Sequence, residues 1–217
     1  MKRVLVLILF VFSAQVGAYN EGALKRLLEF NECMDCDLLG VNLAGAKLRG
    51  ANLRGAMLRG VILFETDLSG ADLRAASITG DLRAAQLYWA NLRTTSLAAV
   101  DLRKANLTEA DLRGATLFQC DLREANLSGA DLTNARIGES DLRDANLSGA
   151  DLTNAKLPSV DLRGAILTDV ILTGSDLRWV DLTRAYLSGA NLTKADLEGT
   201  IFCDTTMPNG TINNSGC

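Results

Sequence analysis

One feature constrains the fold more than any other: leucine or isoleucine recurs every five residues over most of the chain. These central positions run from Leu38 to Ile78 and from Leu82 to Leu197, with Phe202 in the next place. Such a period matches neither the α-helix, at about 3.6 residues, nor the β-strand, at about 2. A helix would spread these side chains around its axis, and a strand would put every second one in water. The chain must therefore turn once per repeat so that each central side chain faces inward.

A small residue precedes each central position by two places, and Asp or Asn usually lies between them. A longer period is also present, because residues 121–140 and 141–160 agree at 14 of 20 positions. Asp-Leu-Arg recurs at 81, 101, 121, 141 and 161. Four repeats therefore make one coil of 20 residues, with one repeat on each of four sides. Alanine is the commonest small residue, as at Ala46, Ala51, Ala105, Ala110 and Ala190.

This pattern resembles that of the pentapeptide-repeat family over residues 36–202. The resemblance implies an all-β fold, a right-handed quadrilateral pentapeptide-repeat β-helix whose interior is a ladder of Leu flanked by Ala. At four repeats per coil we expect about eight coils, with a short N-terminal α-helical cap. Val160, Val170 and Val180 replace the inward small residue and predict local repacking. One residue is missing at Gly80, where we expect a local kink and no domain boundary.

The first 18 residues have the pattern of a secretory signal peptide: basic Lys2 and Arg3, an apolar run, and small residues before the expected cleavage after Ala18. The run is too short to span a membrane as a helix. We therefore expect an exported protein, with residues 19–35 as an N-terminal helical cap, residues 36–202 as the β-helix and residues 203–217 as a C-terminal cap. No stable membrane insertion is expected after cleavage.

Both caps follow from the need to cover the apolar ends of a stack of coils. Asn20 can serve as the N-cap of a helix, and residues 207–210 favour a turn that folds the tail back. The apolar residues of the expected helix have helical spacing and should cover the first coil: Ala23, Leu24, Leu27, Leu28 and Phe30.

The cysteines fit the same scheme. Cys203 and Cys217 bracket the tail and predict a disulfide in an oxidising compartment. Cys33 and Cys36 have the spacing of a redox motif but lack a strand–helix setting. A structural disulfide that fixes the cap is therefore favoured, and a redox centre is the alternative. Cys120 occupies an inward small-residue position and should be a buried free thiol. Exported members of the resembled family with similar ends imply the periplasm or a thylakoid lumen.

Two sides of the predicted coil are distinctive. One carries a row of Asp at 81, 101, 121, 141, 161 and 181, with Arg two residues after the first five. We expect the two rows to neutralise each other, with a binding surface for a charged partner as the alternative. The next side carries Asn106, Asn126 and Asn146, for which we expect an asparagine ladder; weak binding to a glycan or an ice-like lattice is the alternative.

Few aromatic residues are expected on the surface, and some of them are candidates for contact with a partner. Tyr88 and Trp89 form the first candidate. Arg178 and Trp179 with Tyr186, near the last coils, form the second. Scattered surface residues remain the alternative, because these positions do not form one patch.

No catalytic, cofactor-binding or metal-binding set is expected. The sequence has no His, which excludes the common triads and His-containing zinc sites, and it has no glycine loop for phosphate. The formal net charge of −4, with both signs mixed, argues against nucleic-acid binding. We expect a non-enzymatic, rigid structural or protein-interaction module in an extracytoplasmic compartment, whose partner is another protein. An end cap could also pair two copies.

Two alternatives come from other functional classes. The resembled family includes acidic rods that mimic DNA and protect a type II topoisomerase from inhibitors. An export signal and the Arg rows both argue against that role here. The second alternative is a redox protein that uses Cys33 and Cys36.

Overall fold

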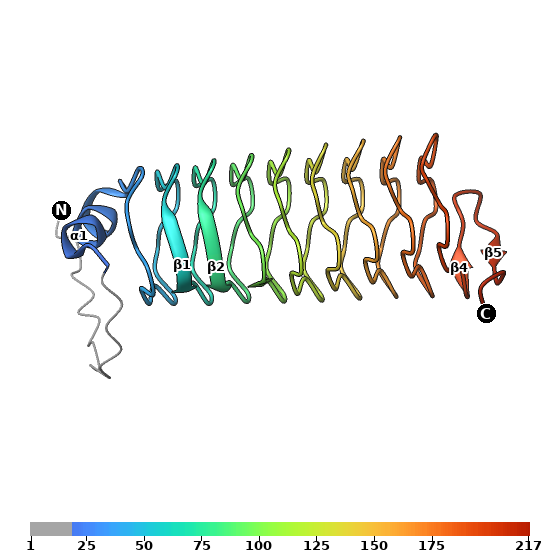
Figure 1. Cartoon of the computed structure of the whole chain (residues 1–217), viewed down its shortest axis with the longest axis horizontal. Coiled ribbons are helices and arrows are strands. Elements are labelled where there is room, and N and C mark those ends of the chain that lie inside the picture. The colour runs from blue at the N-terminus through green and yellow to red at the C-terminus, as the bar shows by residue number, and fades with distance from the viewer. Residues whose placement is uncertain (1–18) are drawn as a thin grey trace.

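Parallel β-bridges connect each coil to the next, from Glu32–Asn52 at one end of the chain to Tyr186–Thr206 at the other. In the computed structural model, which describes residues 19–217, these bridges stack the chain into a repeat β-helix (Figure 1). Bridges such as Asp121–Asp141 join residues 20 positions apart, so four repeats make one coil. The signal peptide expected in residues 1–18 lies outside the described residues.

The interior contains the side chains that the five-residue period placed there. Central residues such as Leu107 and Leu127 are 0–1% exposed, and the inward Ala105 and Ala125 are equally buried. Each repeat then turns tightly, and the amide of Ala105 donates to the carbonyl of Leu102 at 2.9 Å. Burial of each central Leu contributes about 1.5–3 kcal/mol before ordering costs. The buried ladder is therefore the main source of cohesion.

Asp and Asn are common before the central residue because their side chains stabilise the turn that follows it. The Oδ1 atom of Asp121 accepts the backbone N–H of Arg123 at 3.3 Å, and Asn126 does the same for Ser128 at 3.1 Å. Short acceptors that bond to the backbone two residues on are typical of turns. The Asp or Asn before the central residue thus serves the outward turn and not the core.

Val160, Val170 and Val180 replace the inward Ala and slightly lengthen the local turn. The amides of Val160 and Val170 lie 3.3 Å from the carbonyls they donate to, and that of Val180 lies 3.2 Å away, compared with 2.9 to 3.1 Å for the inward alanines. All three valines are buried. The repacking expected at these positions therefore amounts to a slight opening of the corner.

The missing residue is absorbed by a bulge in a short parallel sheet. Strands β1 (Met57–Ile62), β2 (Ser77–Asp81) and β3 (Val100–Asp101) pair in that order. Between β1 and β2, two residues of β1 lie opposite Thr79 alone, and the Thr79 hydroxyl accepts the amide of Gly60 at 2.8 Å. The coils on both sides keep one axis in Figure 1, so the expected local kink is confined to this bulge. The mismatch is local because a side chain replaces the lost backbone acceptor.

Gly80 makes this bulge sterically feasible. Its φ is +123°, and a Cβ there would lie 2.9 Å from the nitrogen of Val61 and overlap the carbonyl oxygen of the same residue. No other residue type avoids that overlap. The prediction that a residue without a Cβ resolves the register conflict is confirmed.

A helix covers the first coil. Helix α1 (Glu21–Phe30) begins at Asn20, whose side chain accepts the amide of Ala23 at 3.0 Å. Ala23, Leu24 and Leu27 are buried against the coil as expected. Leu28 and Phe30 are exposed instead, because one helix of ten residues can turn only one face toward the coil.

A hairpin ends the chain. Strands β4 (Thr205–Thr206) and β5 (Ile212–Asn213) pair antiparallel around the Met207–Gly210 turn, in which the amide of Met207 donates to Thr211. Leu192 and Leu197 in the final coil are only partly buried. Among the described residues, no helix is long and apolar enough to cross a membrane.

Candidate interaction surfaces

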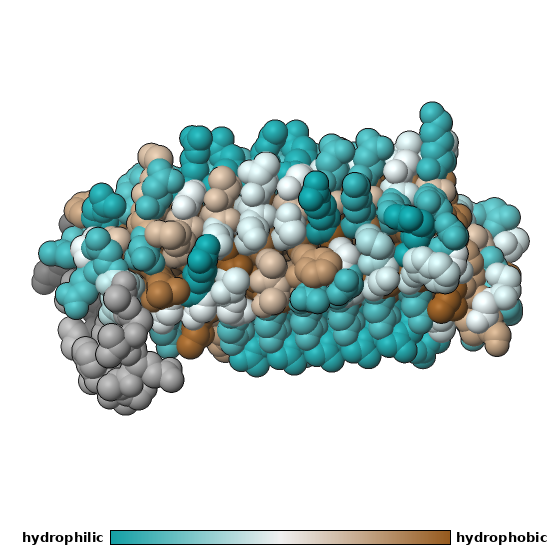
Figure 2. All heavy atoms as spheres, in the orientation of Figure 1, coloured by the Kyte–Doolittle hydropathy of each residue, from teal (hydrophilic) through white to brown (hydrophobic). Residues whose placement is uncertain are grey.

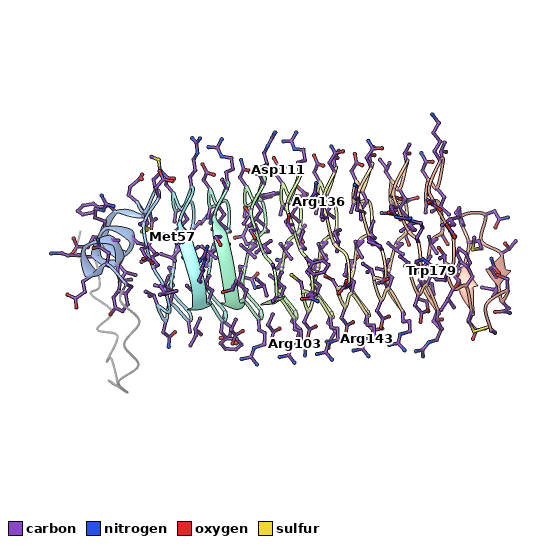
Figure 3. All side chains as sticks on the ribbon, in the orientation of Figure 1. Met57, Arg103, Asp111, Arg136, Arg143 and Trp179 are labelled. Carbon is purple, nitrogen blue, oxygen red and sulfur yellow. A yellow bond between two sulfur atoms is a disulfide. The ribbon has the colours of Figure 1, made fainter. Side chains whose placement is uncertain are left out.

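The four sides of the rod differ in chemistry. In chain order we call them the Asp/Arg side (for example 101–103), the amide side (106–108), the second acidic side (111–113) and the shelf side (116–118). Figure 3 shows Arg103 and Arg143 along the lower edge of the rod, Asp111 on the upper edge and Arg136 between them.

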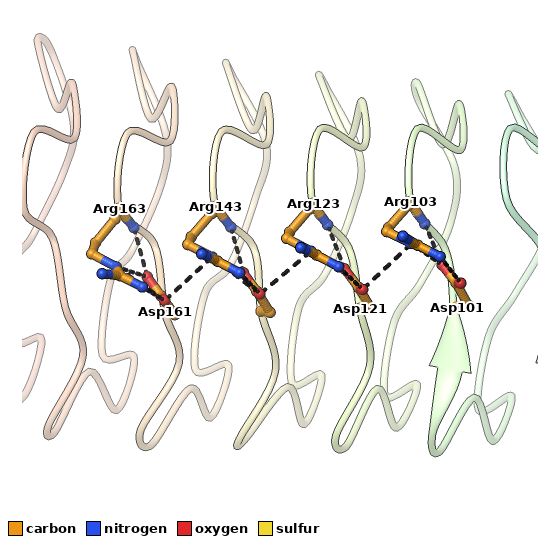
Figure 4. A network of polar contacts seen from close by, with 8 residues as sticks. Asp101, Arg103, Asp121, Arg123, Arg143, Asp161 and Arg163 are labelled. Carbon is orange, nitrogen blue, oxygen red and sulfur yellow. Dashed lines mark hydrogen bonds and ion pairs between the residues drawn. The ribbon is translucent and has the colours of Figure 1, made fainter.

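The Asp/Arg side is one continuous ladder of ion pairs (Figure 4). The Nη2 atom of Arg123 lies 2.6 Å from Asp121 in its own coil, and its Nε atom lies 3.5 Å from Asp141 in the next. The same arrangement repeats from Asp81 to Asp181. Each guanidinium thus separates two stacked carboxylates. The expected self-neutralised side is confirmed.

The pairing also shifts the acidity of these groups. The hydrogen bond from the Arg123 side chain holds the pKa of Asp121 below its usual value, against an opposing effect of burial. Arg83 does the same for Asp81. A shallow groove of about 320 Å³ follows this ladder at its N-terminal end, lined by Phe64, Arg83, Arg103 and Lys104 among others. Its arginines already bind carboxylates, so they offer little unpaired charge to a ligand.

The amide side does not form the expected asparagine ladder. Asn106 donates to Gln86 of the preceding coil at 3.2 Å, which is a bond along the stack. Asn126 and Asn146 instead use Oδ1 to accept the amides of Ser128 and Ser148 within their own coils. Local turn bonds are stronger competitors than the bonds along the stack, because each turn amide needs an acceptor.

Tyr88 and Trp89 lie together at the corner after the amide side. Their rings are 5.4 Å apart and nearly perpendicular, and Trp89 Nε1 donates to Glu109 at 2.6 Å. Trp89 is 59% exposed. Its φ of +57° is unusual for a bulky residue, and most other coils have Gly at this corner. The ring is therefore both exposed and fixed.

Trp179 occupies a corner between the shelf side and the Asp/Arg side. It is 63% exposed, has a φ of +61°, and its ring fills the space that a Cβ at Gly199 would take. Arg178 beside it pairs with Asp176 at 2.7 Å and reaches toward Asp196 at 3.7 Å. Tyr186 lies on the amide side, so the structure separates it from Arg178 and Trp179, with which the sequence had grouped it.

The shelf side has a feature that the sequence interpretation missed. Arg136 and Lys156 face each other in adjacent coils, the one bridge between two cations in the part of the chain that the structure describes. Neither side chain makes an ion pair with a described residue. Beside them Phe118 and Pro158 close over Gly138, which is buried although it faces outward. The sequence signal for this pair is a basic residue in place of Asp or Asn at two positions 20 residues apart, which the coil stacks directly on each other.

The cysteines lie where the sequence placed them. The structure joins Cys33 to Cys36 under α1 and Cys203 to Cys217 across the tail. Cys33 and Cys36 are buried, which leaves no open sulfur of the kind that thiol exchange requires. Burial raises the pKa of the Cys120 thiol to about 11, and this thiol donates to the carbonyl of Leu97. No cluster of acidic or sulfur ligands suited to a metal occurs among residues 19–217.

The repeat and the fold of this chain also occur in known proteins. The family model described as pentapeptide repeats matches 8 copies over residues 36–80, 81–123, 110–149, 145–184 and 181–214. Full-length QnrB1, a plasmid-mediated fluoroquinolone resistance protein, is 21% identical, with a TM-score of 0.65 over 76% of this chain and 92% of that one. This likeness concerns the fold alone.

Two further solved structures are more distant in shape. HetL, from the cyanobacterium Nostoc sp. strain PCC 7120, is 29% identical and covers 91% of this chain and 100% of its own, with a TM-score of 0.44. A protein of the Arabidopsis thaliana thylakoid lumen is 24% identical over 71% and 74%, with a TM-score of 0.26. A sequence comparison with curated proteins gives no significant match.

Proposed function

Because the chain belongs to the pentapeptide-repeat family, we propose that it is a non-enzymatic, rigid protein-interaction module that acts outside the cytoplasm. The proposed rod is the right-handed, quadrilateral form that the family resemblance implies, with about eight coils. Its partner is another protein, and its surface, not an internal site, carries the function.

The observation that carries this proposal is the state of the two corner tryptophans. Trp89 and Trp179 are more than half exposed, yet both rings are held by contacts within the rod. Tryptophan is typical of the residues that dominate binding energy at protein interfaces, and a fixed ring loses little entropy on binding. Both lie at corners whose left-handed backbone many other non-glycine residues of the rod share, so the exposed aromatic side chains, and not the backbone, distinguish them.

Export is supported by the ends of the chain. Two disulfides, Cys33–Cys36 and Cys203–Cys217, fit an oxidising compartment. The signal pattern of residues 1–18 points the same way. We propose the periplasm or a thylakoid lumen as the compartment.

Protection of a type II topoisomerase by DNA mimicry is less well supported. QnrB1 shares the fold, but at 21% identity the likeness extends no further. A DNA mimic needs a row of unopposed negative charge, whereas here Arg103 and Arg123 each lie between two Asp residues. A redox role is also disfavoured, because both sulfurs of Cys33–Cys36 are buried.

Cell fractionation combined with mass measurement of the mature N-terminus tests this function. We expect the chain to begin at Tyr19 and to reside in the periplasm or lumen. In parallel, purified mature protein should not relieve gyrase from a fluoroquinolone in a supercoiling assay. An uncleaved cytoplasmic chain that does relieve gyrase would refute the proposal in favour of topoisomerase protection.

A further inference from the structure

The shelf side contains a cation pair beside an apolar strip, and we propose that this surface binds an acidic, apolar segment of a partner protein. We call it the cation shelf and define it by Phe118, Arg136, Gly138, Lys156 and Pro158. The inference rests on the proposed interaction function and specifies the chemistry of the partner.

The cation pair differs from the charge pattern of the Asp/Arg side. There each guanidinium lies between carboxylates of two coils, as Arg123 does between Asp121 and Asp141. Arg136 and Lys156 face each other on adjacent strands, and like charges in that position destabilise a sheet.

No described acid offsets this repulsion by direct pairing. The coil before Arg136 presents Thr116, and the coil after Lys156 presents Asp176, which Arg178 already binds at 2.7 Å. A carboxylate from outside the chain would bridge both cations and remove their repulsion. The pair is therefore complementary to an anionic partner, although the protein as a whole is acidic.

The strip beside the pair, which consists of Phe118, Gly138 and Pro158, provides an apolar contact. Gly138 has no side chain at an outward position, and a Cβ there would lie 3.4 Å from Pro158 Cγ and 3.6 Å from Phe118 Cδ2. Phe118 remains 39% exposed. Figure 2 faces this side of the rod and shows weakly polar to apolar atoms in its centre, above the hydrophilic Asp/Arg edge.

These features together favour a protein segment over other anions. An inorganic anion would make no use of the apolar strip. An anionic membrane surface is recognised by clusters of about four to eight basic residues, and this shelf has two. Nucleic acid would meet an acidic rod. Trp179 lies on a corner of the same side, nearer the C-terminal end of the rod (Figure 3).

Binding of labelled synthetic peptides, measured by fluorescence anisotropy, tests the cation shelf. The probes are extended peptides that alternate Glu with Phe or Leu, and matched peptides with Lys in place of Glu. The mature protein should bind the acidic peptides and not the basic ones. The double variant R136Q/K156Q should weaken binding roughly tenfold, and Phe118→Ala should weaken it as well.

The matched control is the double variant K47Q/R49Q, which removes two exposed and unpaired cations from the amide side. It should leave affinity unchanged, and R136E/K156E should bind the basic peptides instead. Circular dichroism verifies that each variant is folded. Equal loss in both glutamine variants, no binding of acidic peptides by the wild-type protein, or binding of anionic vesicles in their place would overturn the inference. None of these results bears on the compartment or on gyrase, so the proposed function is tested separately.

Discussion

At the scale of single residues, three of the five repeat positions each have one physical task. The central Leu fills the interior, the preceding Asp or Asn accepts a turn amide, and the small residue leaves room for the Leu layer. Leu122, Asp121 and Cys120 show the three tasks in sequence. Cys120 can replace Ala because its thiol is small and finds an acceptor in the core.

Gly80 gives the sharpest prediction at this scale. Gly80→Ala should lower the free energy of unfolding by more than about 2 kcal/mol, because its Cβ would overlap the backbone of Val61. Gly70→Ala, at a φ of +63° with no atom near the added Cβ, should cost only about 1 kcal/mol. Urea unfolding of both variants measures the difference. Equal costs would contradict the bulge geometry.

Individual residues also show which features the sequence predicts and which it does not. Periodicity fixed which side chains face inward, since any other assignment would expose leucines. Periodicity does not predict whether the Asn126 side chain bonds to Asn residues along the stack or to the backbone of its own turn. Both partners are close, and the choice depends on the geometry of the turn. The expected burial of Leu28 is wrong for a similar reason. Helical spacing shows which residues share a face of the helix but not how much of that face the first coil covers.

At the scale of elements, the Asp/Arg side links stability to pH. Asp81, Asp121 and Asp141 have lowered pKa values, through hydrogen bonds from their arginines for the first two and despite a larger burial effect for Asp141. A carboxyl with a lowered folded pKa contributes stability above its unfolded pKa, near 3.8, and loses it as pH falls through the folded value.

The urea midpoint should therefore fall between about pH 4 and pH 2. In the variant D121N/D141N this pH dependence should be weaker, since two of the shifted groups are gone. Unfolding curves at several pH values provide the measurement. A midpoint that is flat below pH 4, or an equal slope in the variant, would show that the ladder does not stabilise the fold.

The C-terminal cap gives a second prediction for an element. Cys203–Cys217 spans a sequence separation of 14, and its loss through Cys217→Ser should cost about 3 kcal/mol in the chain-entropy model. Cys33–Cys36, with a separation of 3, closes a far shorter loop, so Cys36→Ser should cost less, about 2 kcal/mol. Thermal unfolding of the oxidised proteins compares the two. A larger cost at the N-terminal bond would reverse this ranking of the caps.

At the scale of the whole molecule, the sequence predicted a four-sided rod and the chemistry of two of its sides. Coil length, the neutralised side and the helical cap could be anticipated because each follows from a regular spacing in the sequence: five and 20 residues for the coil and its sides, and helical spacing for the cap. The cation shelf was missed, although the 20-residue coil places Arg136 beside Lys156, because the pair stands out only when the charges at the same position of successive coils are compared. The grouping of Tyr186 with Trp179 failed at the same scale, since proximity in sequence does not give a common side.

The central claim is that fixed aromatic residues on a rigid exported rod contact a partner protein. Site-specific photo-crosslinking in the native host tests it most directly, with the photoreactive residue placed at Trp179, at Trp89 or, as a control, at Thr94, an exposed corner that shares their backbone conformation. We expect one discrete crosslinked protein from Trp179 or Trp89 and none from Thr94. No crosslink from either tryptophan position, or the same products from all three corners, would contradict the claim.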